Sequence, residues 1–417
     1  MNKQERSWVF YDWANSAYSI AITSTIFPIF FKGVISKGVE GYTSTAWLGY
    51  GNSIYTLVIA VLAPILGTIA DYKNYKKRFF LGFFLLGVVS TACLALTREG
   101  SWMTAIVIYI LTALGFGGAN IFYDSFLIDV TPRERMDWVS TSGFAWGYIG
   151  STIPFIIGIA LIMKYDMLGF STSVPAVRIS FLLTALWWFV FTIPLLRNVK
   201  QNYFIEPSQT PVRDSFRRLA DTFRRIRQYR NVFIFLIAYF LYIDGVDTII
   251  KMATAFGTDI GISANMLMVI LLAVQFVAFP FALLYGKLAK VFSAKKMLIV
   301  GICTYVVITI TAFFIPRFAD PKTKVMVFWI VSMLVASSQG GIQALSRSFY
   351  GKLIPKKESA EFFGFYNIFG KFAAILGPFL MGFITMITKS SGVGILSIIV
   401  LFIAGGVILT RAKEAEE

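Results

Sequence analysis

The 417-residue sequence contains no histidine and only two cysteines. Without histidine, a Ser-His-Asp triad, a histidine metal site and a histidine proton relay are all excluded, so any proton chemistry must use carboxylates. Cys93 and Cys303 each lie inside an apolar run, so they form neither a disulfide framework nor a CxxC ligand pair. The sequence therefore predicts no metal site and no cofactor.

Charged residues are also scarce, at 14% of the chain, whereas hydrophobic residues make up 57%. Soluble domains contain about 45–50% apolar residues, so the excess indicates a membrane protein. It is enough for about twelve segments of the roughly 20 apolar residues that cross a bilayer. The predicted fold class is an all-α polytopic membrane protein with twelve transmembrane helices. Hydropathy and turn residues place the helices near residues 8–31, 46–70, 79–97, 102–128, 137–163, 178–196, 231–254, 264–289, 296–316, 324–350, 360–387 and 393–410.

The twelve helices divide into an N-terminal six-helix bundle at 1–198, a cytoplasmic linker at 199–230 and a C-terminal six-helix bundle at 231–417. Within the linker, Pro211 to Arg230 reads as an amphipathic basic helix that should lie on the inner membrane surface and bind anionic lipid. The net charge of +16 is explained by basic cytoplasmic loops, so nucleic acid is not an expected partner. Both termini are expected in the cytoplasm, in the cell inner (plasma) membrane.

The two halves of the chain also repeat each other. GGANIFYDSFLIDVTPRE, from Gly117, aligns without a gap on the segment from Gly340, GGIQALSRSFYGKLIPKKE, over its first eighteen positions. Such a repeat predicts two homologous bundles related by pseudo-symmetry. Positions at which the charge is inverted between the halves are Asp124 with Arg347, Asp129 with Lys352, and Asp71 with Lys290.

Three motifs resemble a known family. GTIADYKNYKKR, at 67–78, resembles the loop after the second helix of the major facilitator superfamily. YDWANSAY at 11–18 and LYIDGVDTI at 241–249 are similar to the first and seventh helices of the vacuole effluxer-like family, whose fungal members act in autophagy. The resemblance implies a twelve-helix transporter, with amino-acid efflux from the vacuole for the fungal members. The short loops are more like those of bacterial members.

Ionisable side chains inside the predicted spans mark a candidate transport path. The resemblance implies that helices one, four, seven and ten line the cavity, and most of the buried charges lie in these four helices. Each such charge costs at least ~2.5–3.5 kcal/mol in hydrocarbon, so it should face the protein interior or water. With polar and aromatic neighbours, the candidates for binding substrate or a proton are Asp12, Asn15, Tyr18, Asn120, Tyr123, Asp124, Trp146, Tyr242, Asp244, Asp247, Gln343, Arg347, Tyr366 and Lys371.

Two readings stay open for the acidic candidates. Asp244 and Asp247 share a helical face with Lys251, so the carboxylates could exchange a proton during transport, or Asp247 could pair permanently with Lys251. Asp12 could bind a substrate ammonium or a proton, or it could cap the cytoplasmic end of the first helix.

The cationic candidates are equally open. Arg347 and Lys371 could hold a carboxylate or phosphate of the substrate, or could neutralise Asp124 or Asp12.

A second set of residues lies where the helices meet the cytosol. Interbundle ion pairs could form there when that side closes and break when it opens, although such residues could also serve only as topology signals. The gating candidates are Gly67, Asp71, Arg78, Asp129, Arg133, Lys290 and Lys352.

The sequence favours a secondary transporter that works by alternating access, and it leaves proton coupling open. Opposite charges in one cavity favour a small zwitterion such as an amino acid or short peptide, exported from the cell by a monomer. A lipid or hydrophobic-drug transporter or flippase is the alternative. A non-transporting sensor or enzyme is a further one, but the chain has no GxSxG or GxxxxGK[ST] motif, so no enzyme is predicted.

Overall fold

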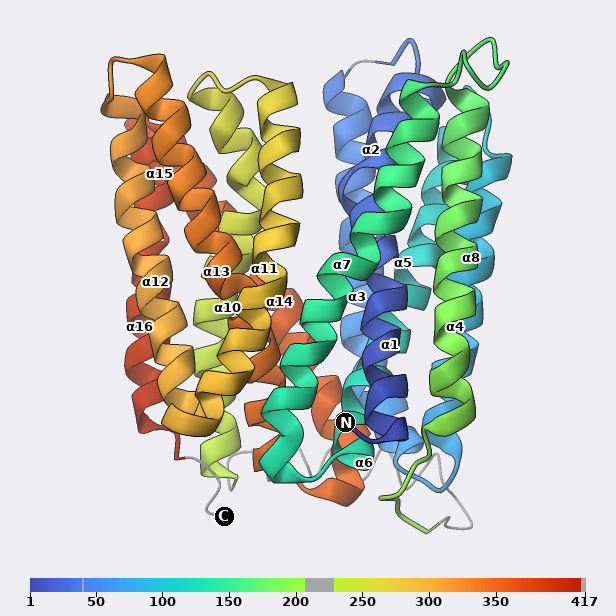
Figure 1. The fold of residues 1–417 in the computed structure, drawn as a ribbon, viewed down its shortest axis with the longest axis vertical. Coiled ribbons are helices and arrows are strands. Elements are labelled where there is room, and N and C mark those ends of the chain that lie inside the picture. The colour runs from blue at the N-terminus through green and yellow to red at the C-terminus, as the bar shows by residue number, and fades with distance from the viewer. Residues whose placement is uncertain (40, 207–228, 414–417) are drawn as a thin grey trace. The chain divides into compact units, whose positions relative to one another are not determined.

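The computed structural model describes residues 1–39, 41–206 and 229–413. Nearly all of this part of the chain is helical (Figure 1). Within these ranges, the β-type pairing is confined to an isolated bridge between Tyr72 and Ile205. The basic linker helix predicted from Pro211 falls on 207–228, outside the described residues.

Twelve helical segments of the described chain are long and apolar enough to cross a membrane, and each lies within a few residues of a predicted span. This confirms the predicted all-α, twelve-helix membrane fold. The α-helices are α1 (Lys3–Tyr18), α2 (Ile26–Phe30), α3 (Gly41–Ala70), α4 (Tyr75–Cys93), α5 (Trp102–Ser125), α6 (Leu127–Val130), α7 (Met136–Met163), α8 (Val174–Asn198), α10 (Arg230–Asp259), α11 (Ala264–Phe292), α12 (Ala294–Phe314), α13 (Pro321–Leu353), α14 (Ser359–Thr388), α15 (Ser391–Ser397) and α16 (Ile399–Arg411).

The first span begins earlier than hydropathy predicts, at Lys3, and continues to Ile35. A capping box starts it: the side chain of Asn2 accepts the N–H of Glu5 at 2.8 Å, and the carboxylate of Glu5 accepts the N–H of Asn2 at 2.7 Å. The same carboxylate accepts the hydroxyl of Thr131 at 2.9 Å. These bonds explain how a polar first turn can be part of the span.

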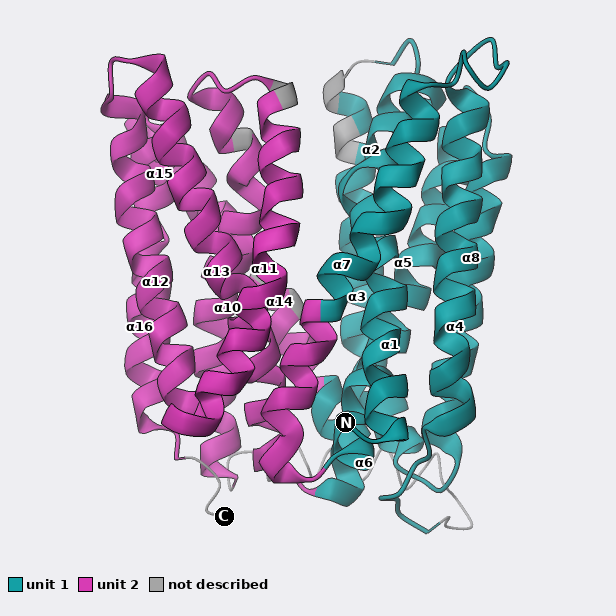
Figure 2. Cartoon of the chain, in the orientation of Figure 1, with its two compact units in different colours: residues 1–131, 146–219, 356–364 teal, residues 132–145, 220–355, 365–417 magenta. Residues whose placement is uncertain are grey.

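The chain forms two compact units that follow its two sequence halves except near the starts of α7 and α14 (Figure 2). Among the described residues, unit 1 contains 1–39, 41–131, 146–206 and 356–364, and unit 2 contains 132–145, 229–355 and 365–413. The first residues of α7 therefore pack within unit 2, and the first residues of α14 pack within unit 1. Both helices pass from one unit to the other along their length.

Aromatic rings fill the interior of each unit. In unit 1, Trp8 stacks on Tyr123 with ring centroids 4.4 Å apart, and both rings are buried. In unit 2, Tyr239 stacks on Tyr366 at 4.3 Å. Several predicted site residues therefore belong to the packed cores of their units.

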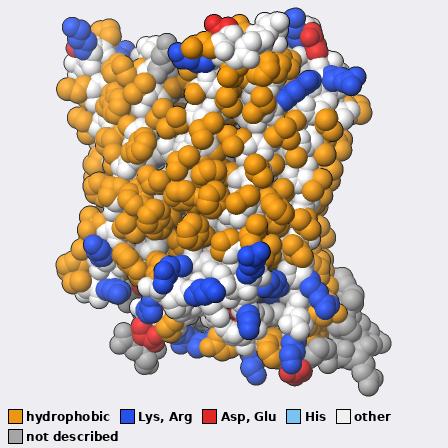
Figure 3. Space-filling model, turned by 45° about the vertical axis from the view of Figure 1, so that its right-hand side comes forward, with side chains coloured by type: hydrophobic (Ala, Val, Ile, Leu, Met, Phe, Trp, Pro, Cys, Tyr) orange, Lys and Arg blue, Asp and Glu red, His pale blue; other side chains and the backbone are white. Residues whose placement is uncertain are grey.

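The outer surface is strongly apolar. Figure 3 shows hydrophobic side chains across the middle of the visible face, with Lys and Arg side chains gathered mainly toward the lower end. Large apolar side chains such as Leu57, Met103 and Phe379 are more than half exposed, as expected for residues that face lipid chains. The sequence places the basic loops on one side of the membrane, and this face has the same polarity.

Candidate functional site

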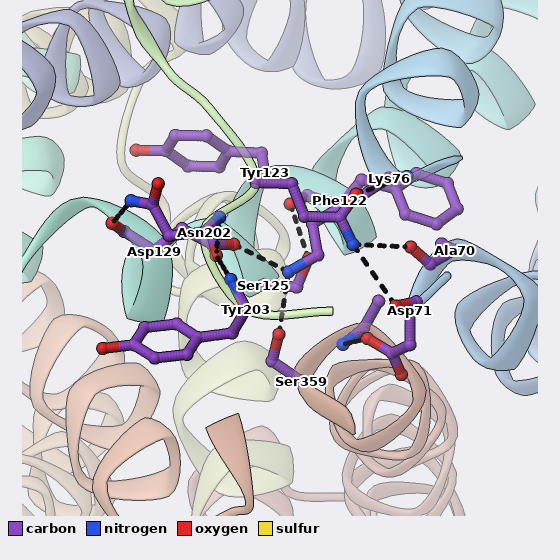
Figure 4. Close-up of polar contacts among 12 residues, drawn as sticks. Ala70, Asp71, Lys76, Phe122, Tyr123, Ser125, Asp129, Asn202, Tyr203 and Ser359 are labelled. Atoms are coloured by element: carbon purple, nitrogen blue, oxygen red, sulfur yellow. Dashed lines mark hydrogen bonds and ion pairs between the residues drawn. The ribbon is translucent and has the colours of Figure 1, made fainter. Parts of the chain in front are cut away.

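The most connected polar cluster of unit 1 surrounds Asp71, which follows the last residue of α3 (Figure 4). The Asp71 carboxylate is fully buried and accepts the backbone N–H groups of Ala360 and Glu361 at 2.9 and 3.0 Å. These N–H groups belong to the first turn of α14, whose unpaired donors and positive dipole end favour an acidic side chain. Asp71 therefore holds the start of α14.

Lys76, the second residue of α4, makes a second link to α14. Its ammonium donates to the carboxylate of Asp129 at 2.7 Å and to the hydroxyl of Ser359 at 2.8 Å. The side chains of Lys76 and Asp129 are both completely buried. Removing one partner of a buried ion pair of this kind destabilises a protein by several kcal/mol. Lys76, Asp129 and Ser359 are therefore expected to act together.

The first residues of the linker complete the cluster. The second carboxylate oxygen of Asp129 accepts the backbone N–H groups of Asn202 and Tyr203 at 2.7 and 2.9 Å, and the amide of Asn202 donates to the backbone carbonyl of Asp129 (Figure 4). Gln201 donates to the carbonyls of Ala70 and Tyr72. The linker start is thereby bonded to the loop that carries Asp71.

Close backbone approach explains the glycine four residues before Asp71. A Cβ atom at Gly67 would lie 2.5 Å from the carbonyl oxygen of Ala360, so only glycine lets α3 reach α14 here. Gly364 makes the reciprocal approach to the carbonyl of Ala63, where a Cβ would lie at 2.8 Å. The two helices therefore cross with their backbones almost in contact.

Burial raises the pKa of Asp71 to about 8, against an ordinary value of 3.8. The charge of Lys76 and the two N–H bonds lower it, whereas the nearby Glu361 raises it. Asp71 lies between the span that ends at Ala70 and the span that begins at Tyr75, so it is the titratable residue of the cluster that lies outside the membrane spans. Its hold on α14 is sensitive to pH near neutrality.

Unit 2 contains a second cluster, between the start of α7 and the end of α13. The Asp137 carboxylate accepts the hydroxyl of Ser348 at 2.6 Å and the ammonium of Lys352 at 2.5 Å. Arg347 donates to the hydroxyl and the carbonyl of Ser140 at 2.9 and 3.1 Å. Again, a charged side chain of one sequence half holds the first turns of a helix from the other half.

Four of the seven gating candidates take part in these contacts: Gly67, Asp71, Asp129 and Lys352. The other three, Arg78, Arg133 and Lys290, have exposed side chains and lie outside the two clusters. Sequence reasoning missed the roles of Lys76, Asp137 and Ser359. Lys76 was one of several adjacent basic residues, and nothing in the local sequence distinguishes it, since its partner Ser359 is 283 residues away.

The midmembrane candidates of unit 1 gather around α1 and α5. Asn15 donates to the side chain of Asn120 at 2.7 Å, and Asp12 is buried one turn before Asn15. Asp12 and Asp124 both lie within electrostatic reach of the Tyr11 hydroxyl. Unit 1 therefore brings two carboxylates and a paired amide together.

The aromatic candidates of unit 1 serve different roles. Tyr18 is buried, shares a hydrogen bond of 2.8 Å with Thr112, and packs in the core together with Tyr123. Trp146 is 43% exposed and its ring lies 6.0 Å from that of Trp13. Of the three, only Trp146 has a large exposed surface.

In unit 2, Asp244 occupies an unusual position on α10. It is fully buried, and one carboxylate oxygen accepts the backbone N–H of Gly377 in α14 at 2.9 Å. Within the described residues, its other oxygen and the hydroxyl of Thr248, one turn further along, have no hydrogen-bond partner. A Cβ atom at Gly377 would lie 2.8 Å from the bonded Asp244 oxygen and 2.0 Å from the Thr248 hydroxyl, so both side chains converge on this glycine.

The remaining candidates of unit 2 are placed as follows. Asp247 forms an i,i+4 ion pair with Lys251 at 3.9 Å, the second of the two readings left open by the sequence. The Tyr242 hydroxyl shares a hydrogen bond of 2.7 Å with Ser346. Gln343 is half-buried, Tyr366 and Arg347 are buried, and the Lys371 side chain lies outside the described part of the structure.

These features define a class of protein. Twelve membrane-spanning helices with charged residues inside are typical of a transporter, and solved transporter structures, the major facilitator superfamily symporter XylE among them, match nearly the whole chain. The proton:xylose symporter XylE matches with a TM-score of 0.74 at 11% identity, over 99% of this chain and 96% of that one. A bacterial homologue of the iron transporter ferroportin matches with a TM-score of 0.69 at 12% identity, over 98% of both chains. At such identities the likeness shows the fold.

The family follows from sequence. The model described as vacuole effluxer Atg22 like matches residues 1–132 and 128–415. The uncharacterized MFS-type transporter YxiO of Bacillus subtilis is 52% identical over 414 residues, covering 99% of this chain and 95% of that protein. Autophagy-related protein 22 of Saccharomyces cerevisiae is 24% identical over 383 residues, which cover 79% of this chain and 70% of that protein. The chain belongs to the vacuole effluxer Atg22-like family of major facilitator transporters. The predicted family and the predicted transporter class are confirmed.

Proposed function

We propose that this chain is a proton-coupled transporter that exports a small zwitterionic solute, such as an amino acid or a short peptide, by alternating access. The buried Asp244 is the observation that carries the proposal. An ionised carboxylate with a single hydrogen bond is costly in the membrane interior, and protonation removes that charge. A group that is neutral when buried and ionised when water reaches it can carry a proton through the transport cycle.

Opposite charges support a zwitterionic solute. Unit 1 contributes the carboxylates of Asp12 and Asp124, which suit an ammonium group. Unit 2 contributes the guanidinium of Arg347, which suits a carboxylate and donates to the two oxygens of Ser140. A solute carboxylate would replace these oxygens as an acceptor.

The clusters around Asp71 and Asp137 serve as the gate in this proposal. Each holds the start of α14 or α7 by a few hydrogen bonds and one ion pair, which can break and reform as a unit. With the termini and basic loops in the cytoplasm of a plasma (inner) membrane, both clusters lie on the cytoplasmic side.

The partners in this proposal are a small solute, protons and lipid. The basic linker helix expected from Pro211 would bind anionic headgroups, and the transporter would work as a monomer. Charge reversal in the linker should weaken association of the purified chain with anionic vesicles but leave neutral vesicles unaffected.

Transport by the purified chain in proteoliposomes tests the central proposal. Thermal unfolding with a panel of amino acids, short peptides, sugars and lipids first identifies a solute that stabilises the folded state. Uptake of that solute is then measured with and without an imposed pH gradient. Exchange of labelled for unlabelled solute needs no net proton movement, so it serves as the measure of intact binding.

Asp244→Asn should abolish the effect of the pH gradient and keep solute exchange. Asp259→Asn is the matched control, because it makes the same chemical change at an exposed position of the same helix. If Asp244→Asn folds normally and responds to the pH gradient like the parent, the proton-coupling proposal is wrong.

A further inference from the structure

Buried oxygen atoms gather around Gly377 of α14, inside unit 2. The side chains of Asp244 and Thr248, one turn apart on α10, are both completely buried. One oxygen of Asp244 accepts the N–H of Gly377 at 2.9 Å, whereas its other oxygen and the hydroxyl of Thr248 have no hydrogen-bond partner among the described residues. Buried polar atoms normally have a partner, so these oxygens indicate a site for a bound group.

The oxygens of the two side chains lie within reach of one small ion. The point beside Gly377 at which a Cβ atom would sit is 2.0 Å from the hydroxyl oxygen of Thr248 and 2.8 Å from an oxygen of Asp244. Protein oxygens surround Ca²⁺ at about 2.3–2.6 Å, and Na⁺ is of nearly the same size. Because residue 377 is glycine, it adds no side chain of its own to this space.

The next residue of α14 releases a further oxygen. Pro378 lies inside the helix and has no N–H, so the carbonyl of residue 374 cannot receive its usual helical hydrogen bond. A helical carbonyl is directed along the axis toward the residue four positions later, so this one is directed toward Pro378, next to Gly377. Backbone carbonyls released from a helix are ligands of Na⁺ in transporters.

We propose that Asp244, Thr248 and the released carbonyl of α14 bind a sodium ion. The charge of the site favours a monovalent ion, because Asp244 brings one negative charge whereas Asp247 is paired with Lys251 at 3.9 Å. A divalent ion would leave a net positive charge, which is costly in the membrane interior. The distances beside Gly377 suit sodium better than the larger potassium ion. Sodium takes oxygen ligands, so the absence of histidine does not exclude it.

The inference rests on the proposed function in one respect, since it gives a second ion to the carboxylate that would carry the proton. The two proposals can nevertheless fail separately. Sodium binding is measured at equilibrium on the purified chain, with no solute and no pH gradient. Proton coupling is measured by transport.

Binding of radioactive Na⁺ to the full chain in lipid nanodiscs, at one fixed pH, tests the site. We expect saturable binding from which unlabelled Na⁺ displaces the label and K⁺ does not. Thermal unfolding gives a second measure. An ion that binds the folded state should raise the melting temperature in NaCl above that in KCl of the same ionic strength.

Three variants alter the site. Asp244→Asn and Thr248→Val each remove a ligand and should weaken sodium binding by at least about ten-fold, since even the outer-shell partners of a bound metal contribute that much. Gly377→Ala places a methyl group against both oxygens and should abolish binding.

Each variant has a matched control that makes the same change in the same helix. The controls are Asp259→Asn and Thr258→Val, at exposed positions of α10, and Gly382→Ala, with open space around it on α14. All three should bind sodium like the parent, and thermal unfolding in KCl verifies that every variant is folded.

Two results would overturn the proposal. One is a parent chain that shows no saturable sodium binding and melts at the same temperature in NaCl and KCl. The other is sodium binding that persists unchanged in folded Thr248→Val or Asp244→Asn, because the ion would then lie elsewhere.

Discussion

Neutralising Lys76, at the start of α4, should strongly destabilise the transporter. In Lys76→Met, the buried carboxylate of Asp129 loses the ammonium at 2.7 Å, while the N–H groups of Asn202 and Tyr203 continue to bond its other oxygen. Breaking a buried pair costs about 3–5 kcal/mol, and the two remaining bonds favour the lower end, about 3 kcal/mol. Asp129→Asn should cost a similar amount, because it leaves the ammonium buried with the Ser359 hydroxyl as its remaining acceptor in this cluster.

The double variant separates pairing from independent effects. Lys76→Met with Asp129→Asn removes both charges, so it should lose about 3 kcal/mol rather than the sum of about 6 kcal/mol. Unfolding by sodium dodecyl sulfate in mixed micelles, followed by tryptophan fluorescence, measures these free energies. The control is Lys287→Met, an exposed lysine for which a change within about 0.5 kcal/mol is expected. Additivity of the two single variants to within about 0.5 kcal/mol would refute the buried pair.

Three further changes test the clusters. Because Asp71 has a pKa of about 8 in the folded state and 3.8 ordinarily, the folded state holds an extra proton between these pH values, so the melting temperature should fall as pH rises from 5 to 9. The variant Asp71→Asn should flatten this dependence. Parallel melting curves for the parent and the variant would contradict the prediction. Gly67→Ala places a Cβ 2.5 Å from the carbonyl oxygen of Ala360 and should lower the free energy of unfolding by about 1–3 kcal/mol in the same assay. Gly82→Ala, with open space around it, should be neutral or slightly stabilising. Equal effects of the two variants would argue against the close crossing of α3 and α14. Asp137→Asn should cost less than Asp129→Asn, because the side chain of Lys352 is 22% exposed and can regain water; a larger loss would contradict this ranking.

The spans could be predicted from sequence because hydropathy alone determines where a chain can cross a bilayer. The span predicted at 79–97 is observed at Tyr75–Leu96, and the one predicted at 178–196 is observed at Val174–Asn198. Hydropathy missed the early start at Lys3 because the first turn is polar. The capping box of Asn2 and Glu5 is readable in the local sequence, whereas the bond to Thr131, far along the chain, is not.

The candidate site was predictable only in part. Charge inversion between the repeats pointed to Asp71, Asp129 and Lys352, all of which take part in buried contacts. Their partners could not be derived, because a repeat alignment shows equivalent positions and not neighbours. The choice of Lys76 over Arg78 depends on which side of α4 faces the interior, and Arg78 is exposed.

The assignment of α7 and α14 to both units has a mechanical consequence. The boundary between the units falls between Ala145 and Trp146 within α7, and between Gly364 and Phe365 within α14. Each helix is therefore packed in one unit at its first turns and in the other unit along the rest of its length. If the two units move as separate bodies, either the first turns of α7 and α14 must leave the unit that holds them or the two helices must bend near these boundaries.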